Sequence, residues 1–300
     1  MSRVVVDKHL ETALWGEGIC TFLGYYTVPI FFLSADMKFD RAGIGSGVLV
    51  KIAERLFILT AGHCAEEYRT GQTAIGVAKN EPHRFTPQIS RVNSRFDRQR
   101  GIDFGYVELP ALYERTFSSR SKLFMSQKRI LVETPEQLRR DNDRMVVAGY
   151  PDAMTQSSTT TRHGTHGYEF FYNSTIIGGT GTAMPSTMPP PCPGMQTIDL
   201  SVAPEGQVNT TSGYFDEMQI PRFRGMSGGG CWRSCFEAGG TWEPSQMKLV
   251  GIHVGSDDRF AREILIGHHL RFLAEDYADL ASTIYSTWPE LGAPCWATGI

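Results

Sequence analysis

Three short segments of the 300-residue chain carry side chains that could together perform nucleophilic catalysis. An apolar run, ILTAGHC, places His63 at its end, where a rigid strand can aim an imidazole into a cleft. The segment GIDFGYVEL places Asp103 at the start of an alternating strand. The segment RGMSGGGCW sets Ser227 among four glycines, which allow a sharp turn and bring amide donors near the serine oxygen.

Each segment also has a structural interpretation. A histidine in a turn of small residues is often structural, and a glycine-rich loop with one serine is often a plain turn. An aspartate that opens a strand can merely cap a turn, and Asp97 competes with Asp103 for the catalytic role. The triplet Asp-Phe-Gly occurs in protein kinases, but neither a glycine-rich loop with a following lysine strand nor an HRD-type loop accompanies it.

Taken together, the three segments resemble those of trypsin-like serine proteases. Leu-Thr-Ala-Gly-His-Cys resembles the family's histidine box, and the residues around Ser227 resemble its Gly-x-Ser-Gly-Gly box. The order His, Asp, Ser is that of the chymotrypsin-like fold and differs from subtilisins and α/β-hydrolases. The resemblance implies an all-β fold of two six-stranded antiparallel β-barrels with a C-terminal helix, and serine endopeptidase activity.

The resemblance also implies a role for each residue. A serine hydroxyl is a poor nucleophile without a base whose pKa lies near neutrality, and His63 is expected to be that base. Asp103 is expected to hold the imidazole tautomer while Ser227 attacks a peptide carbonyl. The amides of Gly225 and Ser227 are expected to form the oxyanion hole, worth about 3 kcal/mol per donor.

A later apolar strand, LVGIHVG, corresponds by position to the family strand that pairs with extended substrate, and we expect pairing along Val254 and Gly255. Its Gly-Ile-His-x-Gly pattern is similar to that of bacterial glutamyl endopeptidases and of viral cysteine proteases that cut after Gln. His253 therefore suggests cleavage after Glu, with Gln or Asp as alternatives, or is simply a core histidine. Arg222, five residues before Ser227, matches the position at which glutamyl endopeptidases have a further polar pocket residue, and its guanidinium could pair with a substrate carboxylate. Pro221 stands where trypsins carry an aspartate, so cleavage after Lys or Arg is disfavoured.

Two departures from the family concern covalent and regulatory features. The segment AGIGSGVL holds no cysteine that could pair with Cys64, so the familiar disulfide beside the catalytic histidine cannot form. Met226 replaces the aspartate that receives the new amino terminus in zymogen-activated relatives. We therefore expect an enzyme of a reducing compartment, kept in the cytoplasm and regulated by its long insertion or by a protein partner.

The resemblance implies a peptidase domain at 26–270, between an N-terminal extension at 1–25 and a C-terminal helix and tail at 271–300. A stretch rich in Thr, Ser, Gly and Pro, at about 153–195, is expected to be an inserted loop or hairpin. A further helix is expected at Lys8–Trp15, and one amphipathic helix at Leu270–Trp288. Strands are expected at Tyr26–Leu33, Gly47–Ile52, Leu56–Thr60, Phe104–Leu109, Arg144–Gly149, Thr197–Val202 and Lys248–Val254.

Charge and cysteine usage exclude several partners. The net charge of −3 and pI near 6.3 give no basic field, so neither nucleic acid nor a membrane surface is expected as a partner. Cys231 and Cys235 stand four apart with no second ligand pair at a finger-like spacing, so we expect no metal. His163, His166, His268 and His269 are equally poor candidates, because adjacent histidines cannot easily face one ion. We expect no cofactor.

The sequence thus predicts a serine endopeptidase whose partners are protein or peptide substrates and a possible regulatory protein, with a role in stress or antiphage defence as a further hypothesis. The alternative is a catalytically silent protease-fold module that binds peptides without turnover. The presence of all three catalytic side chains argues against that alternative, because inactive relatives usually lose one of them.

Overall fold

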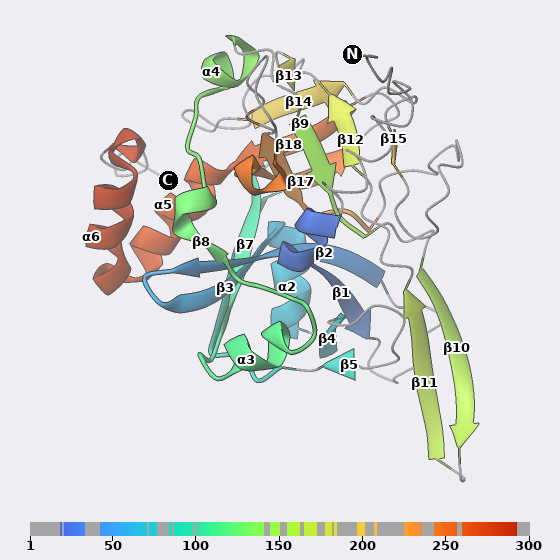
Figure 1. The fold of residues 1–300 in the computed structure, drawn as a ribbon. Helices are drawn as coiled ribbons and strands as arrows, with labels where there is room; N and C mark the ends of the chain where they lie inside the picture. Colours follow the sequence, from blue (N-terminus) through green and yellow to red (C-terminus); the bar gives the residue numbers. More distant parts are fainter. Residues whose placement is uncertain are drawn as a thin grey trace, which may run out of the picture.

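Two antiparallel sheets and a pair of C-terminal helices make up most of the structure (Figure 1). The structure is a computed structural model, and it describes residues 19, 21–33, 43–70, 72–76, 84–85, 87–97, 99–100, 102–140, 145–150, 155–162, 165–172, 178–181, 183–184, 197–201, 207–208, 225–233, 235, 243–256 and 260–292. The expected helix at Lys8–Trp15 lies outside these residues.

The first sheet has the order β5-β4-β1-β2-β3-β7-β6, and β8 adds a short parallel pairing to β2. Strand β3, which leads to His63, is buried along almost its whole length, in keeping with its apolar sequence RLFILT. The bounds are β1 Thr27–Leu33, β2 Gly43–Ile52, β3 Arg55–Thr60, β4 Gln72–Gly76, β5 Arg84–Phe85, β6 Arg91–Asp97, β7 Ile102–Leu109 and β8 Met125–Ser126. Helix α2, Gly62–Thr70, joins β3 to β4.

The second sheet has the order β13-β14-β18-β17-β16-β9-β12-β15. The bounds are β9 Met145–Ala148, β12 Gly178–Gly181, β13 Ala183–Met184, β14 Thr197–Ser201, β15 Gln207–Val208, β16 Gly230–Arg233, β17 Lys248–Ser256 and β18 Phe260–Leu265. Strands β10, Thr155–Arg162, and β11, Thr165–Tyr172, form a separate hairpin in the predicted insertion. In Figure 1 this hairpin extends away from both sheets.

The C-terminal segment forms two helices, so the expected single helix at Leu270–Trp288 is wrong. Helix α5 covers Ile266–Asp276 and helix α6 covers Ala278–Thr287, with Tyr277 between them in an extended conformation (φ −128°, ψ 95°). The Tyr277 hydroxyl donates a hydrogen bond to Glu108 on β7, 2.9 Å away. The helix is thus interrupted at the residue whose side chain contacts the first sheet.

The remaining helical segments are short. They include the helical residues 21–26 before β1, α3 Tyr113–Ser118, η2 Gln127–Arg129, α4 Pro135–Arg140, η5 Pro244–Gln246 and η6 Pro289–Leu291. A large core cluster connects the two sheets and the C-terminal helices through Phe57, Phe104, Trp232 and Leu273, each with no exposed surface. A smaller cluster lies within the first sheet, around Ile58 and Val107.

The predicted all-β class, with antiparallel sheets and a helical C-terminus, is confirmed, and each expected strand is present. The two sheets are consistent with the expected architecture of two six-stranded antiparallel barrels, although among the described strands neither sheet closes on itself. Strands β5, β13 and β15 at the sheet ends have two residues each, which provides few ladder hydrogen bonds for closure.

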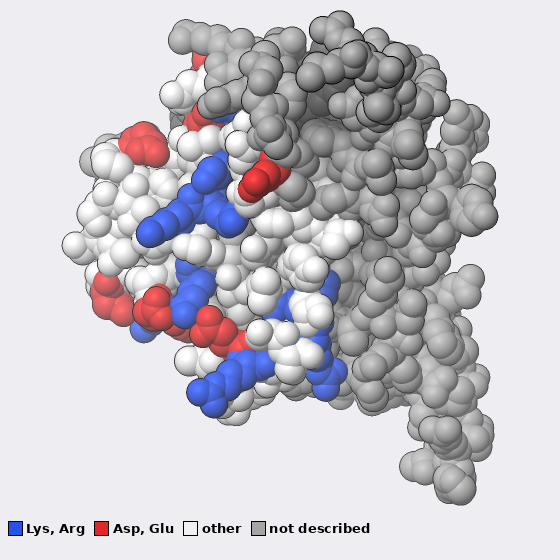
Figure 2. Space-filling view, viewed as in Figure 1, with Lys and Arg blue, Asp and Glu red and all other residues white. Residues whose placement is uncertain are grey.

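On the face in Figure 2, acidic and basic side chains lie close to one another in the described part.

Candidate active site

His63 lies in the first turn of α2, directly after the buried strand β3. The preceding residue, Gly62, allows this turn to approach the β6–β7 hairpin closely. A Cβ at Gly62 would lie 2.5 Å from the Arg95 carbonyl oxygen and 2.8 Å from the Phe104 nitrogen, distances that backbone atoms cannot relieve by rotation. Glycine at this position therefore allows α2 to rest against the strand that carries Asp103.

Both carboxylate oxygens of Asp103 accept hydrogen bonds from His63. Oδ1 accepts from the His63 backbone N–H and Oδ2 lies against the imidazole Nδ1, each at 2.8 Å. Because an ionised carboxylate only accepts hydrogen bonds, the neutral form of the imidazole carries its proton on Nδ1 and a lone pair on Nε2. The negative charge also lies at the N-terminus of α2, where the helix dipole favours it. The pair is partly buried, with 36% of the His63 side chain and 13% of the Asp103 side chain exposed.

The surroundings of His63 shift its pKa. Burial disfavours the imidazolium and lowers the pKa, whereas the hydrogen bond to Asp103 and the neighbouring Cys64 raise it. The net result is a pKa above the usual 6.5. The histidine is thus a stronger base than free imidazole.

Ser227 lies at the centre of a tight turn. The Gly229 N–H donates to the Met226 carbonyl at 2.8 Å, and Gly228 has a φ of +89°. This φ at the third position is characteristic of a type II turn and favours glycine. Space imposes the same requirement, because a Cβ at Gly228 would lie 2.0 Å from the carbonyl oxygen of Ser46.

The turn rests on the segments that carry His63 and the buried strand β2. The Ser227 carbonyl accepts a hydrogen bond from the Ser46 N–H at 2.7 Å and from the Cys64 thiol at 3.6 Å. Ser227 is therefore adjacent to the residue that follows His63. Within the described residues no hydrogen bond joins the Ser227 hydroxyl to the His63 ring, and a looser contact is common in ligand-free active sites.

Gly225, the other predicted oxyanion-hole residue, is buried and adopts a φ of +90°. Its carbonyl oxygen accepts a hydrogen bond from the Ser46 hydroxyl at 3.0 Å. Met226, between Gly225 and Ser227, is fully buried and apolar, so it supplies no charged anchor for the loop. Arg222 and Pro221 lie outside the described residues.

Asp97, the alternative acid, lies at the end of β6. Its Oδ1 accepts hydrogen bonds from the backbone N–H groups of Gln99 and Arg100, both at 3.0 Å. This carboxylate therefore caps the turn between β6 and β7. The Asp103 carboxylate is the one that contacts His63.

His253 flanks the serine turn through its backbone. Its carbonyl accepts from the Gly228 N–H at 2.7 Å and its N–H donates to the Gly229 carbonyl at 2.8 Å. Its Nδ1 lies 2.9 Å from Oε1 of Glu263 on β18, and both side chains are fully buried. Sequence reasoning missed Glu263, whose only signal is an acidic residue in a strand that follows the histidine strand.

Val254 and Gly255 continue β17 beyond its pairing with β16, which ends at Ile252 in the described residues. The ladder to β18 is irregular between His253 and Gly255. Both residues are partly exposed, as an edge that receives extended substrate requires. Their role in substrate pairing stays a prediction.

Helix α5 packs behind the strands that carry the candidate residues. His269 Nε2 lies 3.2 Å from the carbonyl oxygen of Thr60, the last residue of β3. The rings of His268 and His269 contact Phe104, the neighbour of Asp103. Burial lowers the pKa of His268 to about 3 and of His269 to about 4, so both are neutral.

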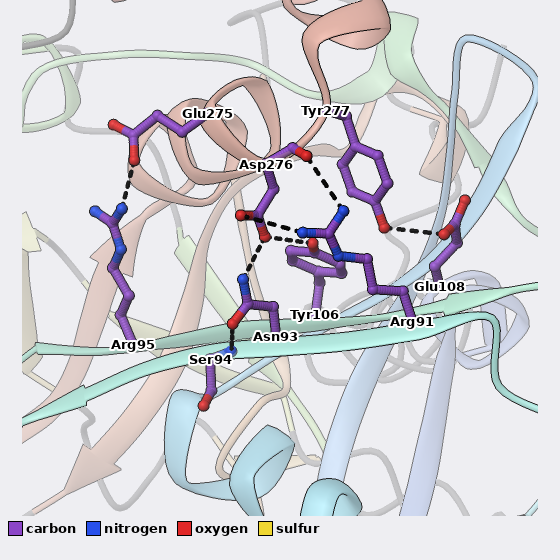
Figure 3. Close-up of polar contacts among 9 residues, drawn as sticks. All are labelled: Arg91, Asn93, Ser94, Arg95, Tyr106, Glu108, Glu275, Asp276 and Tyr277. Carbon is purple, nitrogen blue, oxygen red and sulfur yellow. Dashed lines mark hydrogen bonds and ion pairs between the residues drawn. The ribbon is translucent and has the colours of Figure 1, made fainter.

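A polar network joins the end of α5 to one face of the β6–β7 hairpin (Figure 3). Asp276 accepts hydrogen bonds from Asn93 and Tyr106, and Glu275 pairs with Arg95. Arg91 donates to the Asp276 carbonyl at 3.2 Å and stacks over the Tyr277 ring. The strand that pairs with the Asp103 strand is thus fixed to the C-terminal helices.

No group of His, Cys, Asp and Glu among the described residues is arranged to hold a metal ion. The described helices include none with the length and apolar character that spanning a bilayer requires. Among the described cysteines, Cys64 and Cys231 form no disulfide.

Comparisons with known proteins find similarity only at the level of structure. No protein-family model and no curated protein matches the chain. The chain is similar to the thermostable serine protease AL20 from an extremophilic microorganism, with 13% identity, a TM-score of 0.42, and coverage of 81% of this chain and 92% of that one. It is similar to the protease Anisep from Arthrobacter nicotinovorans, with 13% identity, a TM-score of 0.43, and coverage of 80% and 90%.

A third similar structure is the active form of the Rv3671c protease from M. tuberculosis, with 13% identity, a TM-score of 0.40, and coverage of 98% of this chain and 93% of that one. All three structures are named as proteases. At identities and TM-scores this low, the likeness carries no argument about what this chain does.

Proposed function

We propose that the protein is a serine endopeptidase in which Ser227 is the nucleophile, His63 the general base and Asp103 the residue that orients the base. The pair of hydrogen bonds that His63 donates to Asp103 is the observation that supports this proposal most strongly. It places the proton on Nδ1 and leaves Nε2 to accept another. The adjacent serine turn supplies the hydroxyl that would give up its proton.

In this mechanism Nε2 of His63 takes the hydroxyl proton as Ser227 attacks the substrate carbonyl carbon. The imidazolium, stabilised by Asp103, then gives that proton to the leaving amine, and water repeats the cycle on the acyl-enzyme. The amides of Gly225 and Ser227 stabilise the negative oxygen of the tetrahedral intermediate. We expect substrate binding to bring the Ser227 hydroxyl within hydrogen-bond distance of Nε2 of His63.

The test is covalent labelling of the purified full-length protein with a fluorescent fluorophosphonate. Wild type is expected to label at one site, while Ser227→Ala is expected not to label and His63→Ala to label far more slowly. Asp97→Asn is the matched control, because its carboxylate caps a turn, and it should label as wild type does. If Ser227→Ala is labelled as strongly as wild type, the assignment is overturned. If wild type itself is not labelled, the silent peptide-binding module is favoured.

We also propose that the enzyme prefers Glu before the scissile bond, with His253 in the primary pocket. The position of His253 beside the serine turn, with Glu263 accepting from Nδ1, supports this role. A peptide library that varies this position is expected to favour Glu for wild type and to lose that preference in His253→Ala. A variant that still prefers Glu would remove His253 from the pocket.

Regulation and compartment complete the proposal. We infer a cytoplasmic enzyme with a protein regulator in stress or antiphage defence, and the absence of a disulfide at Cys64 and Cys231 supports the reducing compartment. The insertion at about 153–195 is the candidate regulatory element. Full-rate peptide cleavage by the isolated enzyme, unchanged when the insertion is deleted, would contradict regulation by either route.

A further inference from the structure

A buried serine on β2, Ser46, binds the candidate oxyanion loop at two points. Its hydroxyl donates to the Gly225 carbonyl at 3.0 Å, and its backbone N–H donates to the Ser227 carbonyl at 2.7 Å. Ser46 has no exposed surface. It lies 179 residues before Gly225 in the chain, so these bonds connect the first sheet to the loop that follows the insertion.

The direction of the hydroxyl hydrogen bond is unambiguous. The Ser46 oxygen accepts from the backbone N–H of Tyr150 at 2.9 Å, and an N–H can only donate. The single hydroxyl proton therefore points to the Gly225 carbonyl, which can only accept. The Ser46 carbonyl in turn accepts from the Thr60 hydroxyl at 2.7 Å, so every polar group of this residue has a partner.

These contacts set the orientation of two peptide planes. A peptide unit is planar, with its C=O and the following N–H on opposite sides. The plane after Ser227 is held at both ends, by Ser46 at the carbonyl and by His253 at the Gly228 N–H. The plane after Gly225 is held by the Ser46 hydroxyl at its carbonyl. Gly225 has a φ of +90° and lacks a Cβ, so without this bond few restraints would oppose rotation of its peptide.

We propose that Ser46 is a positioning residue that keeps the Gly225–Ser227 loop in the conformation that binds the oxyanion. This inference rests on the proposed function, since it assigns a support for the same site. Ser46 does not touch substrate. The two peptide planes that it holds flank the plane between Met226 and Ser227, which carries the Ser227 N–H, so Ser46 acts through the position of that amide. Gly149 packs closely against the same loop, because a Cβ there would lie 3.1 Å from both Met226 and the Ser46 hydroxyl.

The proposal predicts a loss that is confined to transition-state binding. Removal of the hydroxyl in Ser46→Ala frees the Gly225 peptide, and kcat for a peptide substrate is expected to fall about 10- to 100-fold with KM nearly unchanged. The inhibition constant of a peptide aldehyde, which forms a tetrahedral adduct with the serine, should rise by a similar factor. Ser46→Cys keeps a weak donor of similar shape and should show a smaller loss of both.

The matched control is Thr27→Val, which removes another fully buried hydroxyl with a single bond to a backbone carbonyl, that of Leu23 at 3.0 Å. It is expected to lose comparable stability while keeping kcat and the aldehyde affinity. Equal kcat and aldehyde affinity in wild type, Ser46→Cys and Ser46→Ala would overturn the proposal, as would a rise in KM alone. If Ser46→Ala does not fold, an unchanged kcat in Ser46→Cys is sufficient to reject it.

The two proposals fail in different ways. If wild type is not labelled by fluorophosphonate, the proposed function fails before Ser46 is considered. If wild type is labelled at Ser227 and Ser46→Ala cleaves peptide at the wild-type rate, the endopeptidase assignment remains and the role of Ser46 is rejected.

Discussion

At the residue scale, the arrangement of Asp103 determines what His63 can do. One carboxylate oxygen holds the backbone of His63 and the other holds its ring, so the aspartate fixes both the position and the tautomer of the base. Because the pKa of His63 is raised, its neutral form is populated only toward higher pH. General-base catalysis requires that neutral form.

The pH dependence of catalysis follows with a definite sign. The kcat/KM of wild type is expected to rise with pH through an apparent pKa above 6.5, the usual value for histidine. In Asp103→Asn the raising influence is lost, so the residual activity should titrate at lower pH and fall by about 10⁴-fold because the wrong tautomer is held. Rates measured over the pH range for both enzymes provide the check. If the apparent pKa of kcat/KM is the same in the variant as in wild type, Asp103 does not raise the pKa of His63.

Residue types and order sufficed to single out His63, Asp103 and Ser227 as candidates, because the chemistry of acyl transfer needs these groups and the glycine-rich turn. Ser46 and Glu263 could not be found in the same way. A serine after a glycine in a strand, or a glutamate in another, has no local pattern that distinguishes it. Their partners lie in other segments, so only the folded arrangement reveals them.

At the element scale, α5 acts as a brace for the hairpin that carries Asp103. Alternate residues of β6, Arg91, Asn93 and Arg95, face the end of the helix and bind Glu275 and Asp276. On the other face, Ser94 bonds to Glu66 of α2, the helix that His63 opens. The two helices thus hold β6 from opposite sides.

Asp276→Asn tests the brace. The carboxylate accepts from two side chains and is 17% exposed, so its replacement by an amide is expected to lower the free energy of unfolding by about 1–3 kcal/mol. Asp279→Asn on α6 is the control, because that carboxylate is 64% exposed in its pair with Arg55, and the loss should be below about 1 kcal/mol. Urea unfolding of both variants is the measurement. Equal losses would show that the network adds nothing beyond a surface ion pair.

Gly45 on β2 provides a second test of element placement. A Cβ at this position would lie 2.9 Å from the Cys64 sulfur, so Gly45→Cys is expected to form a disulfide with Cys64. The closed loop should stabilise the oxidised variant by about 3 kcal/mol over its reduced form. Thiol counting by mass spectrometry and unfolding with and without reductant would measure this. Gly45→Ser matches the crowding without the bond, and alkylation of both Cys64 and the introduced thiol in oxidised Gly45→Cys would contradict the placement.

Alternation of apolar residues predicted the buried strands but missed β6 and α2. The β6 sequence RVNSRFD is mostly polar, and its pairing depends on β7 and on the helices at either side. The turn of small residues before His63 gives no helical periodicity, although α2 begins there. The interruption at Tyr277 was also missed, since the periodicity of apolar residues continues across it.

At the scale of the whole molecule, Lys122 connects the residues at the start of β1, in the first sheet, with Tyr150, which follows β9 of the second sheet. Its ammonium donates to the carbonyls of Gly24 and Thr27 at 2.6 and 2.7 Å and to the Tyr150 hydroxyl at 2.8 Å. The side chain is buried, which lowers the pKa of Lys122 to about 7. The Tyr150 backbone then leads to Ser46 and the serine turn.

This lysine makes stability depend on pH. Between about pH 7 and pH 10.4 the unfolded lysine holds a proton that the folded one has lost, so stability rises with pH over that window. Lys122→Met lacks this contribution, and the free energy of unfolding should therefore change less steeply with pH than in wild type. Urea titrations of both proteins across the window give the comparison. Parallel pH profiles would contradict a titrating buried amine.

The anchoring of the serine turn on β2, α2 and β17 also has a consequence for backbone dynamics. The amide protons of Ser46 and Gly228 are engaged in bonds between segments that are far apart in sequence, and that of Gly229 closes the turn on Met226. In deuterium exchange these amides should be released only by opening events close in energy to global unfolding. The nucleophile would then sit in one of the slowest-exchanging parts of the protein, and substrate would meet a surface already organised for it.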